Sequence, residues 1–200
     1  QVRIPLQLQD PGQHRIRLEL PNDALPSDNQ RSFVVDVKAS IDLQLVDGDP
    51  RAQPFQSETD FLAAVSRAGA APWDVQVVDD SEFMSDPPSN PDVVVLANVA
   101  TLSDVQASRL TTWVEQGGGL VVFPGDLIDS QVYNRQLFQD GVGLLPARLG
   151  DSAESDVVGL VVQSNVDSPL DTLNQLDSTV LTRIRPARIL EVQTSSADVD

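Results

Sequence analysis

The sequence predicts an α/β protein in which a doubly wound parallel sheet follows a small antiparallel β module. Residues 1–40 alternate apolar and polar side chains with a period of two, which is typical of half-buried strands. From Ile41 onward, short apolar runs alternate with amphipathic segments that begin at helix-capping residues. The charge changes at the same point, because residues 1–40 carry five basic and five acidic side chains, whereas residues 41–200 carry eight and twenty-five. Such a shift indicates a module boundary.

The pattern of residues 1–40 predicts part of a β-sandwich. We expect three antiparallel strands, at residues 2–8, 15–20 and 32–38, with a turn at residues 10–13 that contains Pro and Gly. Strands of this kind are typical of an Ig-like module. Three strands bury both faces poorly, so either earlier strands or the second domain would have to cover them.

The second module alternates strands and helices. Ser57 with Asp60, and Ser103 with Gln106, have the spacing of capping boxes, so a helix is expected after each serine. A short helix is expected between the second and third strands, and the order predicts a parallel sheet of flavodoxin-like strand order. The expected strands of the sheet are 41–46, 74–78, 92–97 and 120–123. Further along the chain we expect a helix at 131–138 and extended pieces at 157–163 and 188–192.

These patterns divide the chain into three parts. We expect a partial Ig-like β module at residues 1–40, an α/β domain at residues 41–193 and a frayed tail at residues 194–200. Scarce aromatic residues, at 4%, predict that the core consists of Val, Leu, Ile and Ala side chains.

Composition restricts the available chemistry. The chain has no Cys, one His (His14) and one Lys (Lys38), so residues 41–200 lack a thiol, an imidazole and an amine side chain. Disulfides, zinc–thiolate sites and iron–sulfur clusters are thereby excluded. The formal charge of −17 disfavours nucleic acids and anionic lipid surfaces as partners. Because no apolar run is long enough to cross a bilayer, a membrane would be reached only through segments outside this chain.

Polar side chains follow three of the expected strands. Asp47 and Asp49 come after the first strand, Asn98 after the third and Asp126 after the fourth. Ligands of open α/β sheets bind beyond the carboxyl ends of the strands, so these four residues form a candidate ligand site. Carboxylate oxygens suit Mg²⁺ or Ca²⁺, which makes Asp47, Asp49 and Asp126 candidate metal ligands. The alternative is that Asp47 and Asp49 shape a turn and bind backbone N–H groups.

Known acidic-site enzymes do not match this pattern. Haloacid-dehalogenase-type phosphotransferases need Asp-x-Asp-x-Thr after the first strand, and this chain has Arg51 in the Thr position. Response-regulator receivers need an Asp at the third strand end, where this chain has Asn98. Both classes also need a later Lys. The triple glycine at 117–119 precedes a strand, so it indicates a helix end rather than a phosphate-binding loop.

Several strings taken together resemble a known arrangement. They are LVDGDPR at 45–51, ETDFL at 58–62, PDVVVLANV at 91–99 and GGGLVVFPGD at 117–126. The layout resembles the soluble region of bacterial BatA-type membrane-anchored proteins. There, an Ig-like or CARDB-like β module precedes a domain similar to class I glutamine amidotransferases and trehalose-utilisation-type proteins. The resemblance covers residues 1–190 and implies a location on the periplasmic face of the inner membrane, within a longer anchored protein.

The resemblance does not extend to catalysis. Class I amidotransferases carry a Cys on the turn after the strand that matches residues 120–123, and a His and a Glu complete their triad. This chain has Pro124, Gly125 and Asp126 at that turn, so no thiolate–imidazole pair is available. Pro124 also has no N–H to donate to an oxyanion.

We therefore expect a non-catalytic interaction or scaffold module with a protein partner, no enzyme activity and no cofactor. The alternative hypothesis is a domain that binds a divalent metal or a small ligand through the acidic residues at the strand ends. A sugar is the ligand class that relatives of this fold suggest.

Overall fold

A computed structural model describes residues 4–8, 10–21, 29–68, 72–85, 91–156, 159, 178–183, 185–186 and 188–194. In these residues the strands are β1 (Gly12–Glu19), β2 (Gln30–Val37), β3 (Ile41–Asp47), β4 (Trp73–Asp79), β5 (Val93–Ala97), β6 (Gly119–Phe123), β7 (Ala147–Glu154) and β8 (Arg188–Thr194). The α-helices are α1 (Glu58–Arg67), α2 (Asp80–Ser85), α3 (Asp104–Glu115), α4 (Ser130–Tyr133) and α5 (Ser178–Leu181). A π-helix, η2 (Asn134–Phe138), and a 3₁₀ turn, η3 (Gln139–Gly141), follow α4.

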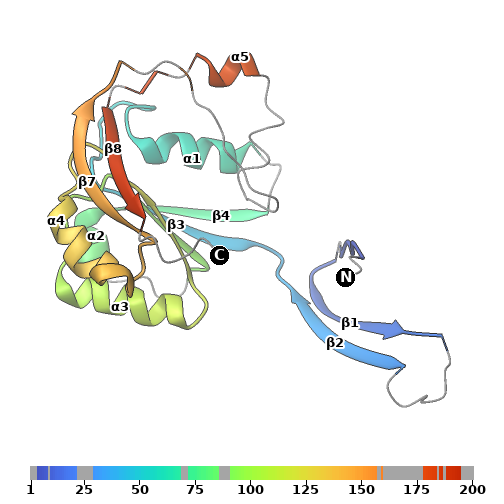
Figure 1. Ribbon diagram of the computed structural model, residues 1–200. Helices are drawn as coiled ribbons and strands as arrows, with labels where there is room; N and C mark the ends of the chain where they lie inside the picture. The colour runs from blue at the N-terminus through green and yellow to red at the C-terminus, as the bar shows by residue number, and fades with distance from the viewer. Residues whose placement is uncertain are drawn as a thin grey trace.

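The centre of the molecule is a four-stranded parallel sheet in the order β4-β3-β5-β6. In its register, Leu45 of β3 lies beside Val77 of β4 and Val95 of β5. Helices lie on both sides of this sheet (Figure 1). The expected α/β class, the parallel sheet and its four strands are thereby confirmed.

Each face of the sheet has its own core, because successive side chains of a strand point to opposite faces. On one face, Leu45 and Val95 pack with Leu62 and Ala63 of α1. The other face carries the larger core, which joins four buried residues of the parallel sheet to α2, α3, α4, η2 and the β7–β8 pair. It contains Val46, Val78, Val94 and Leu96, with Phe83, Leu110, Tyr133, Leu137, Leu149 and Leu190. This arrangement places the ends of β3, β5 and β6 at one edge.

The two long helices begin where their capping residues predict. Ser57 and Asp60 form a capping box at α1, and Ser103 and Gln106 form one at α3. These reciprocal hydrogen bonds satisfy backbone N–H groups that the first turn of a helix leaves without partners.

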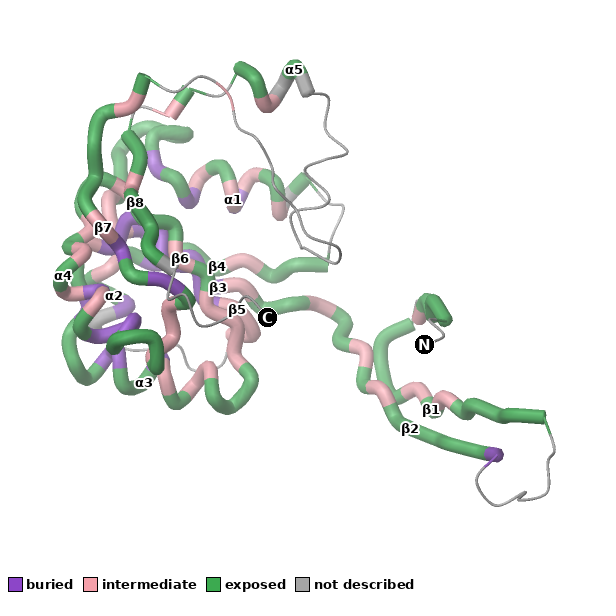
Figure 2. Tube along the Cα trace, viewed as in Figure 1, coloured by how far each residue is buried: buried purple, intermediate pink, exposed green. Residues whose placement is uncertain are grey.

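Strands β1 and β2 form an antiparallel hairpin that precedes the α/β domain (Figure 1). Its ladder gathers apolar side chains on one face. That face carries Ile16, Leu18, Phe33, Val35 and Val37 beside His14 and Arg31, and the other carries Gln13, Arg15, Arg17, Glu19, Gln30, Ser32, Val34 and Asp36. We call the five apolar side chains of the first face the apolar hairpin face. Figure 2 shows both strands mostly exposed, and none of the five side chains of the apolar hairpin face is buried.

The expected strand at residues 2–8, the first of this module, is wrong for the part that the structure describes. Residues 4–8 form no strand, and Ile4 and Leu6 are exposed. Alternation alone does not make a strand, because its backbone groups need a neighbouring ladder. Pro5 also lacks the N–H that such a ladder requires.

The end of the domain differs in detail from the expectation. The predicted helix at 131–138 forms as α4 followed by the π-helix η2, and the extended piece at 188–192 forms as β8. Strand β7, which pairs antiparallel with β8, was not predicted. Within the expected extended piece at 157–163 only Gly159 is described, and its φ of 88° is not that of a strand. Thr194, the first residue of the predicted tail, is the last residue of β8, and residues 195–200 lie outside the described residues. None of the helices formed by the described residues has the length and apolar character needed to cross a membrane.

Candidate functional site

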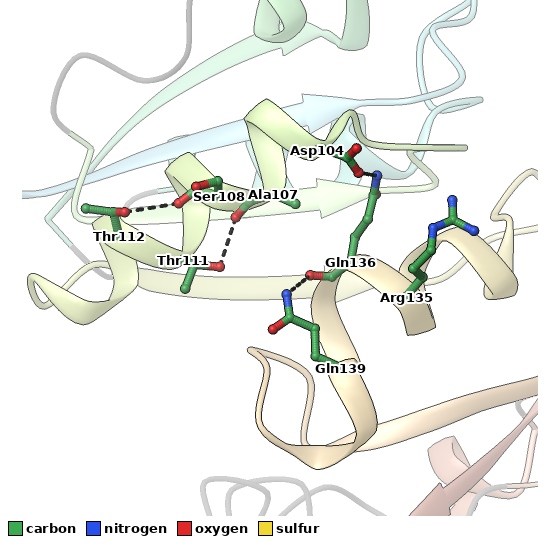
Figure 3. A pocket seen from close by; sticks show the side chains of 8 residues that line it. All are labelled: Asp104, Ala107, Ser108, Thr111, Thr112, Arg135, Gln136 and Gln139. Atoms are coloured by element: carbon green, nitrogen blue, oxygen red, sulfur yellow. Dashed lines mark hydrogen bonds between the residues drawn. The ribbon is translucent and has the colours of Figure 1, made fainter.

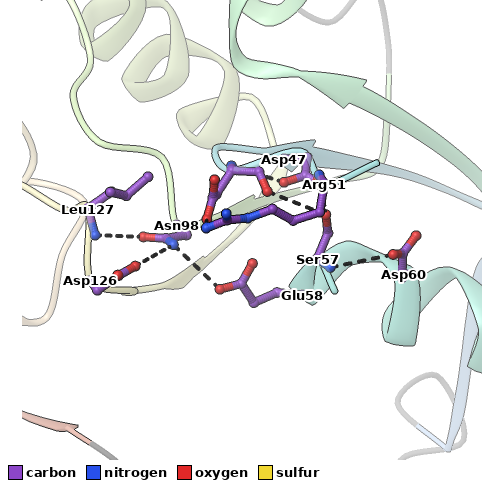
Figure 4. Close-up of polar contacts among 9 residues, drawn as sticks. Asp47, Arg51, Ser57, Glu58, Asp60, Asn98, Asp126 and Leu127 are labelled. Carbon is purple, nitrogen blue, oxygen red and sulfur yellow. Dashed lines mark hydrogen bonds and ion pairs between the residues drawn. The ribbon is translucent and has the colours of Figure 1, made fainter. Parts of the chain in front are cut away.

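Asp47, Asn98 and Asp126 lie at the edge where β3, β5 and β6 end (Figure 4), and Asp49 follows two residues after the end of β3. Asp47 is the last residue of β3, Asn98 follows β5, and Asp126 lies three residues beyond β6. Helix α1 approaches the same edge with its N-terminus, and hydrogen bonds of Asp47 and Ser57 fix the loop at residues 48–57 between β3 and α1.

Asp47 is a buried carboxylate that holds this loop against α1. Its side chain belongs to a residue only 5% exposed. Oδ1 accepts a hydrogen bond from the backbone N–H of Asp49 at 3.0 Å, and Oδ2 accepts one from the Thr59 hydroxyl at 2.6 Å. Both oxygens are therefore engaged, and the alternative prediction of a turn-forming Asp47 is confirmed.

Asp49 and Arg51 form an ion pair on the same loop. The backbone N–H of Arg51 donates to the Ser57 hydroxyl at 3.0 Å, so the residue that caps α1 also fixes the loop in front of the helix. The Asp49 carboxylate thus faces a cation from its own loop.

Asn98 is the centre of the edge and is 2% exposed. Its backbone N–H donates to the Phe123 carbonyl at 3.0 Å, and its side-chain oxygen accepts from the Leu127 N–H at 3.0 Å. Its side-chain nitrogen donates to Asp126 at 3.0 Å and reaches Glu58 at 3.5 Å. With a backbone φ of 52°, Asn98 occupies the left-handed region that Asn tolerates better than most residues.

Gly125 leaves the space into which Asn98 fits. A Cβ added at Gly125 would lie 2.2 Å from Cγ of Asn98, which is far inside van der Waals contact. A glycine is therefore required beside this amide, and the turn after β6 is shaped around it.

Asp126 is the exposed member of the set. The hydrogen bond from the Asn98 amide lowers the pKa of Asp126, and the charges of Arg188 and Arg51 act in the same direction. Arg188 starts β8, so a third part of the chain contributes charge to this edge. Asp126, Glu58 and the two arginines make the exposed surface polar with charges of both signs.

The structure thus places the four predicted residues at one edge of the sheet but in two separate groups of polar contacts. Asn98 and Asp126 are in direct contact, whereas Asp47 and Asp49 share a turn and bind Thr59 and Arg51. Across the described ranges, no group of three or more His, Cys, Asp or Glu side chains is placed to hold a metal ion. The arrangement can hold loops in place and bind ions or polar groups at its exposed rim.

Sequence reasoning missed Glu58 and Thr59. Both lie in the first turn of α1, directly after the predicted capping serine. Since the first turn of that helix must meet the carboxyl end of the preceding strand, the strand–loop–helix order itself was the signal that could have found them.

The fold and this edge together define an α/β domain with a parallel sheet and a hydrogen-bonded polar rim. Comparison of the chain with protein-family models, with curated proteins and with solved structures finds no match.

Proposed function

We propose that this chain is a non-catalytic interaction module that docks on another β-sheet through the apolar hairpin face. The observation that carries the proposal is the cluster of five apolar side chains on one face of β1 and β2, of which none is buried and Leu18 and Phe33 are exposed. A two-stranded hairpin is marginal by itself in water and gains stability when its apolar side packs on a second layer. An antiparallel sheet with an apolar face is the occupant that would complete a sandwich.

The polar edge of the α/β domain supports the non-catalytic part of the proposal. Nucleophilic and general acid–base catalysis need an activated side chain that is within reach of a substrate. Residues 41–200 contain no Cys, His or Lys, and the buried Asp47 is already bound by Thr59 and by the backbone of Asp49. Asp49 is paired with Arg51, and Asp126 accepts a hydrogen bond from the Asn98 amide.

The finer identity of the fold belongs to the same proposal. The order β4-β3-β5-β6 is the one expected of a flavodoxin-like sheet, because the first strand of the sheet lies between the second and the third. The hairpin is the corresponding remnant of an Ig-like module. With the strings at 45–51, 91–99 and 117–126, this supports a degenerate amidotransferase-like domain in a BatA-type anchored protein that faces the periplasm.

A fluorescent dye that binds apolar surfaces tests the docking face in the isolated chain. Phe33 is 45% exposed on the apolar hairpin face, and its neighbour Val34 is 63% exposed on the polar face. Phe33→Ser should lower dye binding and any concentration-dependent self-association measured by light scattering. Val34→Ser is the matched control, which should change neither.

Two outcomes would contradict the proposal. Equal effects of the two substitutions would show that the apolar hairpin face has no special role. Hydrolysis of glutamine, an ester or a phosphoester by the purified chain, lost on Asp126→Asn, would show that the domain is an enzyme.

Small-ligand binding at the strand ends is a second candidate function. It is favoured by the exposed Asp126 and Glu58, which flank the Asn98 amide within the field of Arg51 and Arg188. A thermal-shift series with Mg²⁺, Ca²⁺ and neutral sugars would test it, since a ligand at one hundred times its Kd adds about 2.7 kcal/mol to stability. A shift that disappears in Asp126→Ala is the expected result for this candidate.

A further inference from the structure

A second polar surface lies between α3, η2 and β7 and contains none of the residues of the strand-end site. It consists of two adjoining pockets of about 290 Å³ and about 310 Å³ that share Arg135 and Gln139. Volumes of this size are at the lower end of the range for small-molecule sites. Figure 3 shows the first pocket, where η2 faces the hydroxyl-bearing side of α3.

The first pocket offers hydrogen-bond acceptors. Gln136 is only 8% exposed and donates through its side-chain nitrogen to Asp104 at 3.0 Å, while its side-chain oxygen is buried with no partner among the described residues. A buried acceptor without a partner is costly, so such atoms call for a ligand or a bound water. Thr111 and Thr112 donate to carbonyls of their own helix, which leaves their oxygens available as acceptors.

The second pocket offers cationic donors. Arg135 of η2 and Arg148 of β7 both line it, and within the described part of the chain neither guanidinium group forms an ion pair or a hydrogen bond. Asp140 is the acidic residue in the lining, so the pocket has one positive charge in excess. Two guanidinium groups without partners suit an anionic group such as a phosphate or carboxylate. An anion can bind here although the domain is acidic overall. The attraction of two arginines in contact with the anion exceeds the repulsion from distant carboxylates, because salt screens charges that lie further away.

The backbone between the pockets is irregular in a way that is common at functional sites. Residues Asn134–Phe138 form a π-helix, and Gln139 and Asp140 follow with φ of 49° and 57°. π-helical turns and consecutive non-glycine residues in the left-handed region are unfavourable, and they are concentrated at binding sites. Here they place Arg135, Gln136 and Gln139 on one side of the turn, toward α3.

We propose that these two pockets bind one small anion that carries hydroxyl groups, of the sugar-phosphate or hydroxy-acid class. The anionic group lies between Arg135 and Arg148, and a ligand hydroxyl donates to the side-chain oxygen of Gln136. The ring or carbon chain of the ligand packs on Phe138, which lines the second pocket. This binding is independent of the hairpin face and of the strand-end residues.

Calorimetric titration of the purified chain with three probes tests the site. Glucose 6-phosphate should bind saturably, inorganic phosphate should bind more weakly because it offers no sugar hydroxyls, and neutral glucose should bind at least about tenfold more weakly than glucose 6-phosphate. Affinity for both anions should fall with rising salt concentration.

Substitutions locate the site. Arg135→Gln and Arg148→Gln should each weaken glucose 6-phosphate binding about tenfold or more, because each removes a charge-assisted hydrogen bond. Arg109→Gln is the matched control, since Arg109 is exposed on α3 and lines neither pocket.

The proposal is overturned if neither anion binds saturably at millimolar concentrations, or if Arg109→Gln weakens binding as much as the other two substitutions. Equal affinity for glucose 6-phosphate and inorganic phosphate would overturn the role given to Gln136. Because all three arginines are exposed, the variants should fold, and their circular dichroism spectra should match that of the parent chain.

Discussion

Gly48 lies directly against the backbone of Asn98. An added Cβ at Gly48 would be 2.1 Å from the Asn98 carbonyl oxygen, and the Gly48 N–H donates to the Ala97 carbonyl at 2.9 Å. The turn after β3 is therefore in contact with the turn after β5, and no side chain fits between them. This contact sets the position of the whole polar edge.

Gly48→Ala is expected to destabilise the domain by about 1–3 kcal/mol, because the obstructing atoms belong to the backbone and cannot rotate away. Urea denaturation would measure the loss as a lower midpoint. Gly119→Ala is the control, since its Cβ would meet the Val93 side chain at 3.3 Å, and it should cost less than about 1 kcal/mol. Similar losses for both variants would contradict this account of the turn.

The Thr59 hydroxyl is expected to contribute more to the free energy of unfolding than the hydroxyl of an ordinary threonine on a helix surface. Thr59→Val would leave one oxygen of the buried Asp47 carboxylate without its partner, at a cost of about 1.5–3 kcal/mol. Thr112→Val is the matched control, because its hydroxyl donates only to the carbonyl of Ser108 in the same helix. It should change stability by no more than about 0.5 kcal/mol. Equal stability of Thr59→Val and the parent chain would show that Thr59 does not hold Asp47.

Tyr133 should resist ionisation in the folded protein. It is 1% exposed, its hydroxyl donates to the Val99 carbonyl at 2.7 Å, and burial raises its pKa above the ordinary tyrosine value of 10.0. Above pH 10.0 the unfolded chain loses this proton while the folded chain keeps it, so stability should fall as the pH rises.

The titration is unambiguous because Tyr133 is the single tyrosine of the sequence. Phenolate absorbance should appear together with unfolding rather than before it. Tyr133→Phe should remove the contribution of Tyr133 to this alkaline loss of stability and cost about 1 kcal/mol at neutral pH through the lost hydrogen bond. Phenolate absorbance that rises near pH 10 while the circular dichroism spectrum is still native would refute the prediction.

The ion pair between Lys38 and Asp92 connects the end of the hairpin to the start of β5. The hydrogen bond from Lys38 lowers the pKa of Asp92, with a further contribution from the backbone N–H of Asp42, and the same pair raises the pKa of Lys38. The contribution of Asp92 to stability is therefore present above pH 3.8 and is lost as the pH falls through its lower folded-state pKa. The contribution of Lys38 is present below pH 10.5 and is lost as the pH rises through its higher folded-state pKa.

Lys38→Met should therefore make the unfolding temperature depend less on pH, both at acidic pH, where Asp92 titrates, and at alkaline pH, where Lys38 titrates. Arg17→Gln, which removes the exposed pair with Glu19 inside β1, is the control and should leave both pH dependences unchanged. If the curves of unfolding temperature against pH of Lys38→Met and the parent chain superimposed, the pair would have no role in stability.

Sequence patterns predicted the central sheet and its helix starts because these signals are local. Capping pairs such as Ser57 with Asp60 lie within one helical turn, and the apolar run at 93–97 identifies a buried strand without reference to other elements. The sequence of β7, ARLGDSAE, carries no such signal, since it mixes charged and small residues. Strand β7 forms because β8 pairs with it and because Leu149 enters the larger core.

The residues of the polar edge were predicted as neighbours, and Asn98 and Asp126 are indeed in contact. Their roles could not be predicted, because the partners come from elements that only packing brings near. Thr59 and Glu58 reach Asp47 and Asn98 because α1 packs on Leu45 and Val95. A hydrogen-bond partner 12 or 40 residues away cannot be identified from the residues next to Asp47 or Asn98 in the sequence.

Amino-acid order alone was therefore sufficient for the α/β class, the strands of the parallel sheet, the two capped helices and the lack of thiol, imidazole and amine groups in the domain. Folding in three dimensions decided which polar atoms are satisfied and which, such as the side-chain oxygen of Gln136, are not. The reason is that propensity and periodicity act between residues a few positions apart, whereas hydrogen-bond partnership at an edge depends on the distance between whole elements after their apolar faces have packed.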